Sequence, residues 1–184
     1  MKPFFIFGLP RSRTAWLSTW LTHNDRVCRH DALSQQPSVT RFVIMGQPGN
    51  GFVETAGSMF VRTIYNNFRD AKFAIVRRPE TEVVASLYRC GLHDVSYSVR
   101  ESSRSLREAT DYLISRTSVF QIGFDELDNV ERLGALWTHL RGDEHDEERT
   151  RQMVDFRIVK INPFWNALPE DFVREEETLR RKGK

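Results

Sequence analysis

The sequence predicts an α/β fold of three layers, α/β/α, with a mostly parallel central sheet, in a single domain over residues 1–184. Short apolar runs that suit buried strands alternate with segments whose apolar residues recur at helical spacing, as is typical of a parallel sheet covered on both faces. The chain has 184 residues, 40% of them hydrophobic, which suits one domain around one core. A glycine turn between the first apolar run and the first helical segment indicates a phosphate-loop fold of the nucleotide-binding type.

The first strand, turn and helix carry the most information. Residues 4–7 form an apolar run that breaks at Gly8 and Pro10, and an amphipathic run over residues 16–21 follows. Between the two runs lie cations and hydroxyls, namely Arg11, Ser12, Arg13 and Thr14. Backbone N–H groups and the dipole at a helix start bind anions, most often phosphate. The alternative is a surface turn with two solvated arginines, but the order of strand, glycine turn and helix favours an anion site.

Shorter elements are expected before the next informative segment. Residues 26–29 predict a short strand, and residues 37–51 form a loop-rich stretch with one apolar run. Residues 52–55 are a further strand candidate, and a helix is predicted over residues 59–68.

Residues 72–92 predict a second strand-to-helix junction with polar groups. An apolar run at residues 73–76 suits a buried parallel strand, and Pro79 lies where a helix would begin. Arg78 ends the strand and Ser86 follows eight residues later, so the pair can offer a bidentate guanidinium and a hydroxyl to one anion. The alternative is an ordinary junction in which Ser86 packs among its helix neighbours.

The remaining elements complete the alternation. Helices are predicted over residues 99–116, 126–141 and 147–156, with a strand at residues 119–124. Asp125 is expected to cap the helix that follows this strand. The charged tail at residues 170–184 is expected to be a solvated helix or frayed.

The loop after the first strand is neither of the two common nucleotide loops. A nucleoside triphosphatase loop requires G-x-x-x-x-G-K-[ST], in which Lys contacts the phosphates and the hydroxyl binds Mg²⁺. Counting from Gly8, the last three positions hold Arg13, Thr14 and Ala15, so both groups are missing. The dinucleotide pattern G-x-G-x-x-G is not present either.

Residues 10–17, Pro-Arg-Ser-Arg-Thr-Ala-Trp-Leu, resemble the loop of sulfotransferases that use 3′-phosphoadenosine 5′-phosphosulfate (PAPS), whose pattern is P-[KR]-S-G-T-T-W/L. Six of the eight positions fit, and Arg13 and Ala15 depart from the family's Gly and Thr. Arg78 and Ser86 have the spacing of the Arg and Ser with which the family holds the 3′-phosphate. Residues 119–127 are similar to the family's late core strand, so the resemblance extends from residue 4 to about residue 127.

The resemblance implies a PAPS-dependent transferase whose nucleotide product is 3′-phosphoadenosine 5′-phosphate (PAP). It implies that the 5′-phosphosulfate end is bound by Arg11, Ser12, Arg13, Thr14, Ala15 and Trp16, and the 3′-phosphate by Arg78 and Ser86. Arg11 stands where the family has Lys or Arg and is the candidate for stabilising the leaving phosphate. Its role would be electrostatic, because arginine does not give up its proton at ordinary pH.

A base for the acceptor is expected just past the first helix. There Cys28 precedes His30 and Asp31, much as a Cys precedes two acids, one of them the base, in the similar tyrosylprotein sulfotransferases. We expect His30 to be the base and Asp31 to orient it, because a neutral imidazole accepts a proton readily at pH 7. Glu54 is the reserve candidate, since it too should emerge at a strand end. The alternative is a strand-end turn in which Asp31 caps a helix.

Two departures from the family pattern bear on the site. Glycine in the cofactor loop allows a left-handed backbone, whereas Arg13 carries a Cβ there. The loop must therefore turn differently or direct a second guanidinium at the cofactor. The family often closes the nucleotide with a late basic-glycine segment, and the comparable residues 180–184 are expected to be a disordered basic tail.

Composition narrows the partners and the compartment. The net charge of +2 is too small to indicate nucleic acid. No apolar stretch approaches a membrane span and no His or Cys pair has ligand spacing, so neither a membrane nor a metal is expected. Two cysteines and the lack of a leader pattern favour a cytoplasmic protein with reduced thiols. The acceptor is unspecified, and the short chain favours an open acceptor site or one completed by a second copy in a homodimer.

Two other functions stay open. The first is a P-loop kinase or other phosphotransferase that uses ATP, which the missing Lys and Mg²⁺ ligand disfavour. The second is a non-catalytic protein that binds an adenine nucleotide or a phosphorylated partner. Preference for one ligand over another would separate the three.

Overall fold

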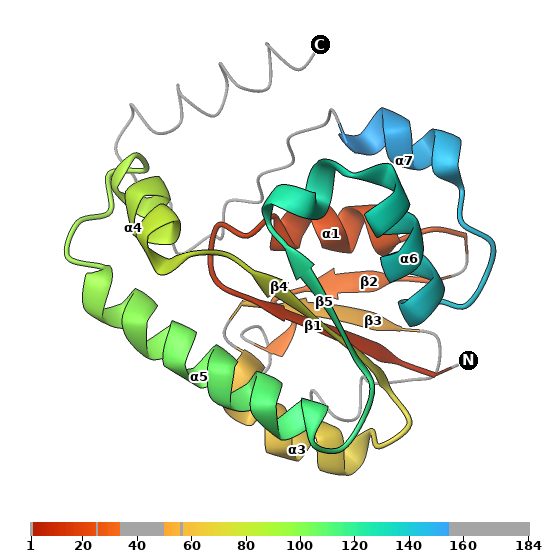
Figure 1. The fold of residues 1–184 in the computed structure, drawn as a ribbon, viewed down its shortest axis with the longest axis horizontal. Helices are drawn as coiled ribbons and strands as arrows, with labels where there is room; N and C mark the ends of the chain where they lie inside the picture. The colour runs from red at the N-terminus through yellow and green to blue at the C-terminus, as the bar shows by residue number, and fades with distance from the viewer. Residues whose placement is uncertain (1, 25, 34–49, 56, 155–184) are drawn as a thin grey trace.

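The structure, a computed structural model, describes residues 2–24, 26–33, 50–55 and 57–154. Within these residues five strands form one sheet in the order β2-β3-β1-β4-β5, and every neighbouring pair is parallel (Figure 1). The strands are β1 Phe4–Gly8, β2 Cys28–His30, β3 Gly51–Glu54, β4 Lys72–Arg77 and β5 Val119–Gly123. The predicted α/β fold is confirmed.

Helices cover both faces of this sheet (Figure 1). One face is covered by α1 Thr14–Leu21 and α6 Val130–Leu140, and the other by α3 Val61–Asn67, α4 Glu80–Tyr88 and α5 Ser96–Ile114. The 3-10 turns η2 Gly57–Phe60 and η3 Asp125–Asp128 precede α3 and α6, and α7 Glu147–Val154 packs against α1. The arrangement is compatible with the expected three layers.

Alternation along the strands divides the core into two clusters, one on each face. On β1, Phe4 and Ile6 face α1 and α6, whereas Phe5 faces α3, α4 and α5. The Phe5 ring stacks on Phe52 and Phe73 of other strands, with centroids 5.1 and 5.7 Å away. These five side chains are at most 1% exposed. Full burial of each contributes about 1.5–3 kcal/mol to folding, which fixes the register that aligns the strand ends.

β1 and β4 are neighbours in the sheet, yet the chain leaves them toward opposite faces. After β1 it enters α1 on one face, and after β4 it enters α4 on the other. The carboxyl ends of two such strands diverge into a crevice, which is where open α/β sheets bind their ligands. Both predicted anion motifs follow these two strands, one from Gly8 and the other from Arg78.

The strand expected at residues 26–29 is displaced. β2 begins at Cys28 because its pairing with β3 begins there, and Val27 lies 46% exposed before it. Parts of other predicted segments fall outside the described residues, namely 37–49, 155–156 and the tail at 170–184 with its basic end.

The prediction that Asp125 caps the following helix is wrong. Asp125 belongs to the 3-10 turn η3, so α6 begins at Val130 rather than at residue 126. Asn129 is the cap, since its side-chain oxygen accepts a hydrogen bond from the Arg132 N–H at 3.0 Å. An Asn cap of this kind satisfies an otherwise unpaired donor in the first turn.

Candidate functional site

The loop between β1 and α1 takes a left-handed backbone at two arginines. Arg11 has φ 63°, and Arg13, the N-cap residue of α1, has φ 57° and ψ 24°. For a residue with a Cβ this region costs about 1–2 kcal/mol. The position where the family pattern has Gly therefore keeps a conformation that glycine adopts easily, although Arg13 occupies it. Strained residues of this kind gather at binding sites.

The Arg13 side chain is held by the elements that cover α1. Its guanidinium pairs with Asp128 and donates to the Leu127 carbonyl at 3.3 Å and to the Val154 carbonyl at 3.1 Å. It also lies 4.9 Å from the centroid of the Trp16 ring. These contacts favour a structural role for this guanidinium over the expected contact with a cofactor.

The two sequence motifs meet at the carboxyl ends of β1 and β4. The Arg11 Nε donates to the Ser86 Oγ of α4 at 3.2 Å, across 75 positions of sequence. The Arg78 guanidinium donates to the Arg11 backbone carbonyl and lies 3.7 Å from the centroid of the Phe124 ring. The structure thus brings together Arg11, Arg78 and Ser86, and adds Phe124, which the sequence analysis did not single out.

Positive charge is concentrated in this cluster. Burial lowers the pKa of Arg78, the neighbouring guanidiniums of Arg11 and Arg89 lower it further, and Glu82 opposes the shift. Glu82, whose Oε2 lies 3.3 Å from the Arg78 Nε, is 52% exposed, whereas the Arg78 side chain is 9% exposed. Like charges placed side by side near one exposed carboxylate produce a positive potential that attracts an anion.

The rest of the loop offers one polar group inside and one at its edge. The Ser12 hydroxyl is buried and has no hydrogen-bond partner among the described residues. The Thr14 hydroxyl lies 3.1 Å from the His30 Nε2. Ala15 and Trp16 are buried, and the Trp16 Nε1 donates to the Met153 carbonyl at 2.8 Å. An unpaired buried hydroxyl costs about 1–3 kcal/mol, so a ligand that reached Ser12 would relieve that cost.

His30 and Asp31 stand beside this loop. The His30 Nε2 lies 3.3 Å from the Asp31 Oδ2, in addition to its contact with Thr14. The Asp31 Oδ1 accepts from the Thr55 N–H at 2.8 Å and from the Thr55 hydroxyl at 2.7 Å. Asp31 therefore holds the end of β3. The sequence analysis missed Thr55, because the one feature that could have indicated it is a hydroxyl next to Glu54 at a strand end.

Glu54, the reserve base, is enclosed at the end of β3. It is 1% exposed, and its Oε1 accepts from the Leu33 N–H at 3.1 Å. Burial raises the pKa of Glu54 to about 8, the charge of Asp31 adds to the rise, and hydrogen bonds from the backbone of Leu33 and Ala32 oppose it. A carboxyl so enclosed does not face an acceptor in this conformation.

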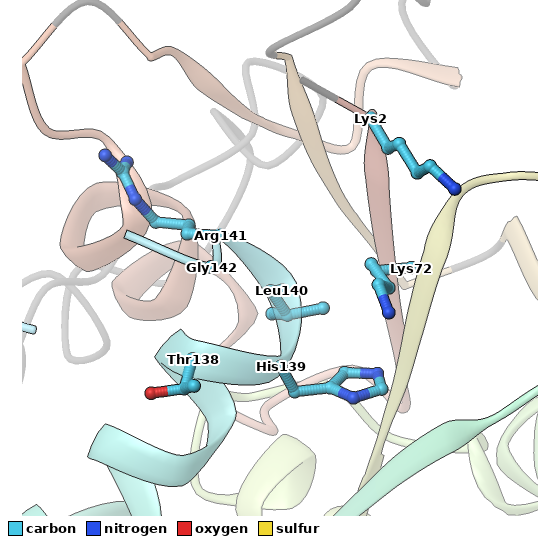
Figure 2. Close-up of a pocket in the computed structure, with 7 residues that line it drawn as sticks. All are labelled: Lys2, Lys72, Thr138, His139, Leu140, Arg141 and Gly142. Atoms are coloured by element: carbon cyan, nitrogen blue, oxygen red, sulfur yellow. The ribbon is translucent and has the colours of Figure 1, made fainter. Parts of the chain in front are cut away.

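A separate cavity of about 320 Å³ lies at the amino ends of β1 and β4 (Figure 2). Its lining residues are Lys2, Lys72, Thr138, His139, Leu140, Arg141 and Gly142. Helix α6 ends there, and the partial negative charge of a helix C-terminus stabilises nearby cations. The cavity lies at the opposite end of the strands from the predicted site.

Neither a metal-ligand cluster nor a membrane-spanning helix is found among the described residues. No cluster of three or more His, Cys, Asp or Glu side chains within these residues is arranged to hold a metal ion. None of the described helices combines the length and the hydropathy that crossing a membrane requires. Comparison with protein-family models gives no match, and comparison with curated proteins gives none either.

Proposed function

We propose that the protein is a sulfotransferase that moves a sulfuryl group from PAPS to a hydroxyl or amine acceptor. The observation that carries this proposal is the contact between the two anion motifs, in which Arg11 meets Ser86 and Arg78 meets the backbone of Arg11. These motifs were selected from sequence for opposite ends of one nucleotide, and they lie together at the topological switch point of the sheet.

The residues present suit the phosphate groups of such a ligand. The guanidinium of Arg78 and the hydroxyl of Ser86 would hold the 3′-phosphate, because a planar fork and a hydroxyl make short charge-assisted hydrogen bonds to one anion. The backbone N–H groups at the start of α1 would hold the 5′ end. The unpartnered Ser12 hydroxyl in the same loop supports the presence of a ligand.

When bound, PAPS supplies an activated sulfuryl group. The acceptor oxygen or nitrogen bonds to sulfur as the bond from sulfur to the phosphate oxygen breaks, and the electron pair leaves with the phosphate. Arg11 stabilises the charge that grows on that phosphate. His30 takes the acceptor proton, and the Asp31 carboxylate 3.3 Å away stabilises the resulting imidazolium.

Thermal stability with different nucleotides tests the cofactor. We expect PAP without Mg²⁺ to raise the melting temperature, since a ligand at a hundred times its dissociation constant adds about 2.7 kcal/mol. 5′-AMP, which lacks the 3′-phosphate, should stabilise less. Arg78→Ala should cost about 2–3 kcal/mol of PAP affinity and little 5′-AMP affinity. Arg77→Ala, which removes an exposed arginine one position earlier, is the matched control and should leave PAP affinity unchanged.

Other outcomes identify the alternatives. Equal or better stabilisation by ATP with Mg²⁺ would indicate a phosphotransferase. Tight PAP binding without transfer to a panel of phenols, amines and sugars would indicate a non-catalytic nucleotide-binding protein. If transfer is found, His30→Ala should lower its rate by roughly 10²–10⁴-fold while PAP affinity stays near that of the parent protein.

A further inference from the structure

The turn after β2 is tied to the end of β3 by two reciprocal contacts. The side chain of Asp31, just after β2, accepts from the N–H and the hydroxyl of Thr55, just after β3. The side chain of Glu54, the last residue of β3, accepts from the N–H of Leu33, which follows β2. We name these four residues, Asp31, Leu33, Glu54 and Thr55, the β2–β3 latch.

The side-chain contacts of the latch lie at a left-handed turn. Asp31 has φ 47°, a conformation that Asp adopts more readily than most residues with a Cβ. β2 has three residues and is an outer strand of the sheet that the described residues form. Its ladder with β3 ends where the Asp31 N–H donates to the Val53 carbonyl at 2.9 Å. His30 is the last residue of β2, so the ladder and the side-chain contacts of the latch together position it.

Glu54 has little freedom to move. It is 1% exposed, and a Cβ placed on Gly57 of η2 would come within 2.7 Å of the Glu54 Cβ. Its register partner on β1 is the apolar Phe7, and α1 carries no charged side chain. Among the described groups on these elements and on the turn after β2, Asp31 is the charged neighbour that acts on Glu54.

We propose that Glu54 is a positioning residue that acts through the β2–β3 latch, and that its proton controls how His30 and Asp31 are held beside Thr14. Protonated Glu54 accepts the Leu33 N–H without repelling Asp31. Ionised Glu54 adds a second negative charge to the latch, and its repulsion from Asp31 strains the turn that follows His30. This inference rests on the proposed function only where it treats His30 as the base.

Glu54 keeps its proton at neutral pH. Burial raises the pKa of its carboxyl to about 8, and the charge of Asp31 adds to that rise. The change in the latch is therefore expected in mildly alkaline solution, above the range in which an ordinary imidazole titrates. The ¹⁵N shifts of the His30 ring should therefore change in two steps as the pH rises. One step is the titration of the ring, and the other follows the ionisation of Glu54.

Nuclear magnetic resonance of the His30 ring in the whole protein tests the proposal, with ¹⁵N shifts followed against pH. The parent protein should show the second step near pH 8. Glu54→Gln keeps an oxygen that accepts the Leu33 N–H but does not ionise, so the second step should be lost while the first remains. Glu126→Gln is the matched control, because Glu126 also accepts a strand-end N–H, from Gly123 at 2.7 Å, and should keep both steps.

A second step that persists in Glu54→Gln, or that the parent protein lacks, would overturn the proposal. Thr55→Val gives an independent reading, since it removes the hydroxyl contact to Asp31 and leaves the Glu54 carboxyl in place. It should reduce the amplitude of the second step at His30, and an unchanged amplitude would also count against the latch. PAP binding is measured separately, so failure of the sulfotransferase proposal would leave these shifts interpretable.

Discussion

Arg13 combines two effects of opposite sign at one position. Its left-handed backbone costs about 1–2 kcal/mol. Its guanidinium gains hydrogen bonds to the carbonyls of Leu127 and Val154, each worth about 1 kcal/mol, and a contact with the Trp16 ring worth about 0.5–1 kcal/mol. The sequence showed the departure from glycine but not its outcome, because the partners of the side chain lie far along the chain.

Arg13→Gly should therefore destabilise the fold slightly. Glycine relieves the backbone cost but loses the carbonyl and ring contacts and orders a more flexible residue, so we expect a net loss of about 1–2 kcal/mol. PAP affinity should stay near that of the parent protein, because the guanidinium points to η3 and α7. Urea unfolding gives the first quantity and calorimetry the second. A marked fall in PAP affinity would show that the side chain reaches the ligand after all.

Ser12→Ala should separate stability from binding at the same loop. Removing a buried hydroxyl without a partner should stabilise the ligand-free protein by about 1 kcal/mol, because folding then no longer desolvates a hydroxyl that gains no hydrogen bond. The rise in melting temperature that PAP produces should shrink at the same time. Differential scanning calorimetry with and without PAP measures both. A destabilised variant would mean that the hydroxyl has a partner, such as an ordered water.

Among the helices and strands, the sequence predicted well which segments near apolar runs are strands and which are helices. β1, β4 and α4 follow their patterns because burial of one face decides them. The exact start of β2 depends on its pairing with β3, and the cap of α6 depends on how η3 folds back after β5. Such boundaries are set by tertiary contacts, which local residue patterns do not contain.

The same limit applies to the candidate site. Arg11, Arg78 and Ser86 could be selected because spacing within a strand-to-helix junction is local. The β2–β3 latch could not, because it joins the ends of two strands through side chains and backbone groups about 20 positions apart. The sequence analysis selected Asp31 to orient His30 and Glu54 as the reserve base, and the structure adds the contacts of both side chains to the backbone.

Helix α7 holds the far end of α1. The Arg149 guanidinium donates to the Trp20 carbonyl at 2.8 Å and to the Thr22 carbonyl at 3.1 Å, and burial lowers the pKa of this arginine. The Trp20 Nε1 donates to the Thr150 hydroxyl at 2.9 Å. A cation on the last carbonyls of a helix satisfies them and complements the helix dipole.

Arg149→Met should lower the free energy of unfolding by about 1–2 kcal/mol, because it keeps the aliphatic length and removes the donors to those carbonyls. Arg151→Met is the matched control on the same helix. Arg151 is 61% exposed and pairs with Glu147, itself 58% exposed, so its loss should change stability by less than about 0.5 kcal/mol. The midpoint of urea unfolding, compared at an unchanged dependence on urea concentration, measures both effects. Equal losses in the two variants would show that the contacts of Arg149 to the end of α1 add no particular stability.

For the whole molecule, Glu54 makes stability depend on pH. Its pKa is raised from 4.5 to about 8 on folding, so the stability it contributes is complete below pH 4.5 and is lost as the pH rises through 8. At about 1.4 kcal/mol per pKa unit, the loss has an upper bound of about 5 kcal/mol. Glu54→Gln should flatten this decline, and Glu126→Gln should not. Urea unfolding at acid, neutral and alkaline pH checks the sign, and parallel curves for the parent protein and Glu54→Gln would contradict it.

The contact between α7 and the first loop also has a consequence for protein synthesis. The Val154 carbonyl, which accepts a hydrogen bond from the Arg13 guanidinium, lies 141 positions after Arg13 in the sequence. Ribosomes add about 5–20 residues per second, so the nascent loop waits on the order of ten seconds for this partner. During that interval Trp16 and Trp20 lack the partners that α7 later supplies, and chaperones recognise such exposed aromatic surface. The first segment to be translated is thus among the last to reach its final form.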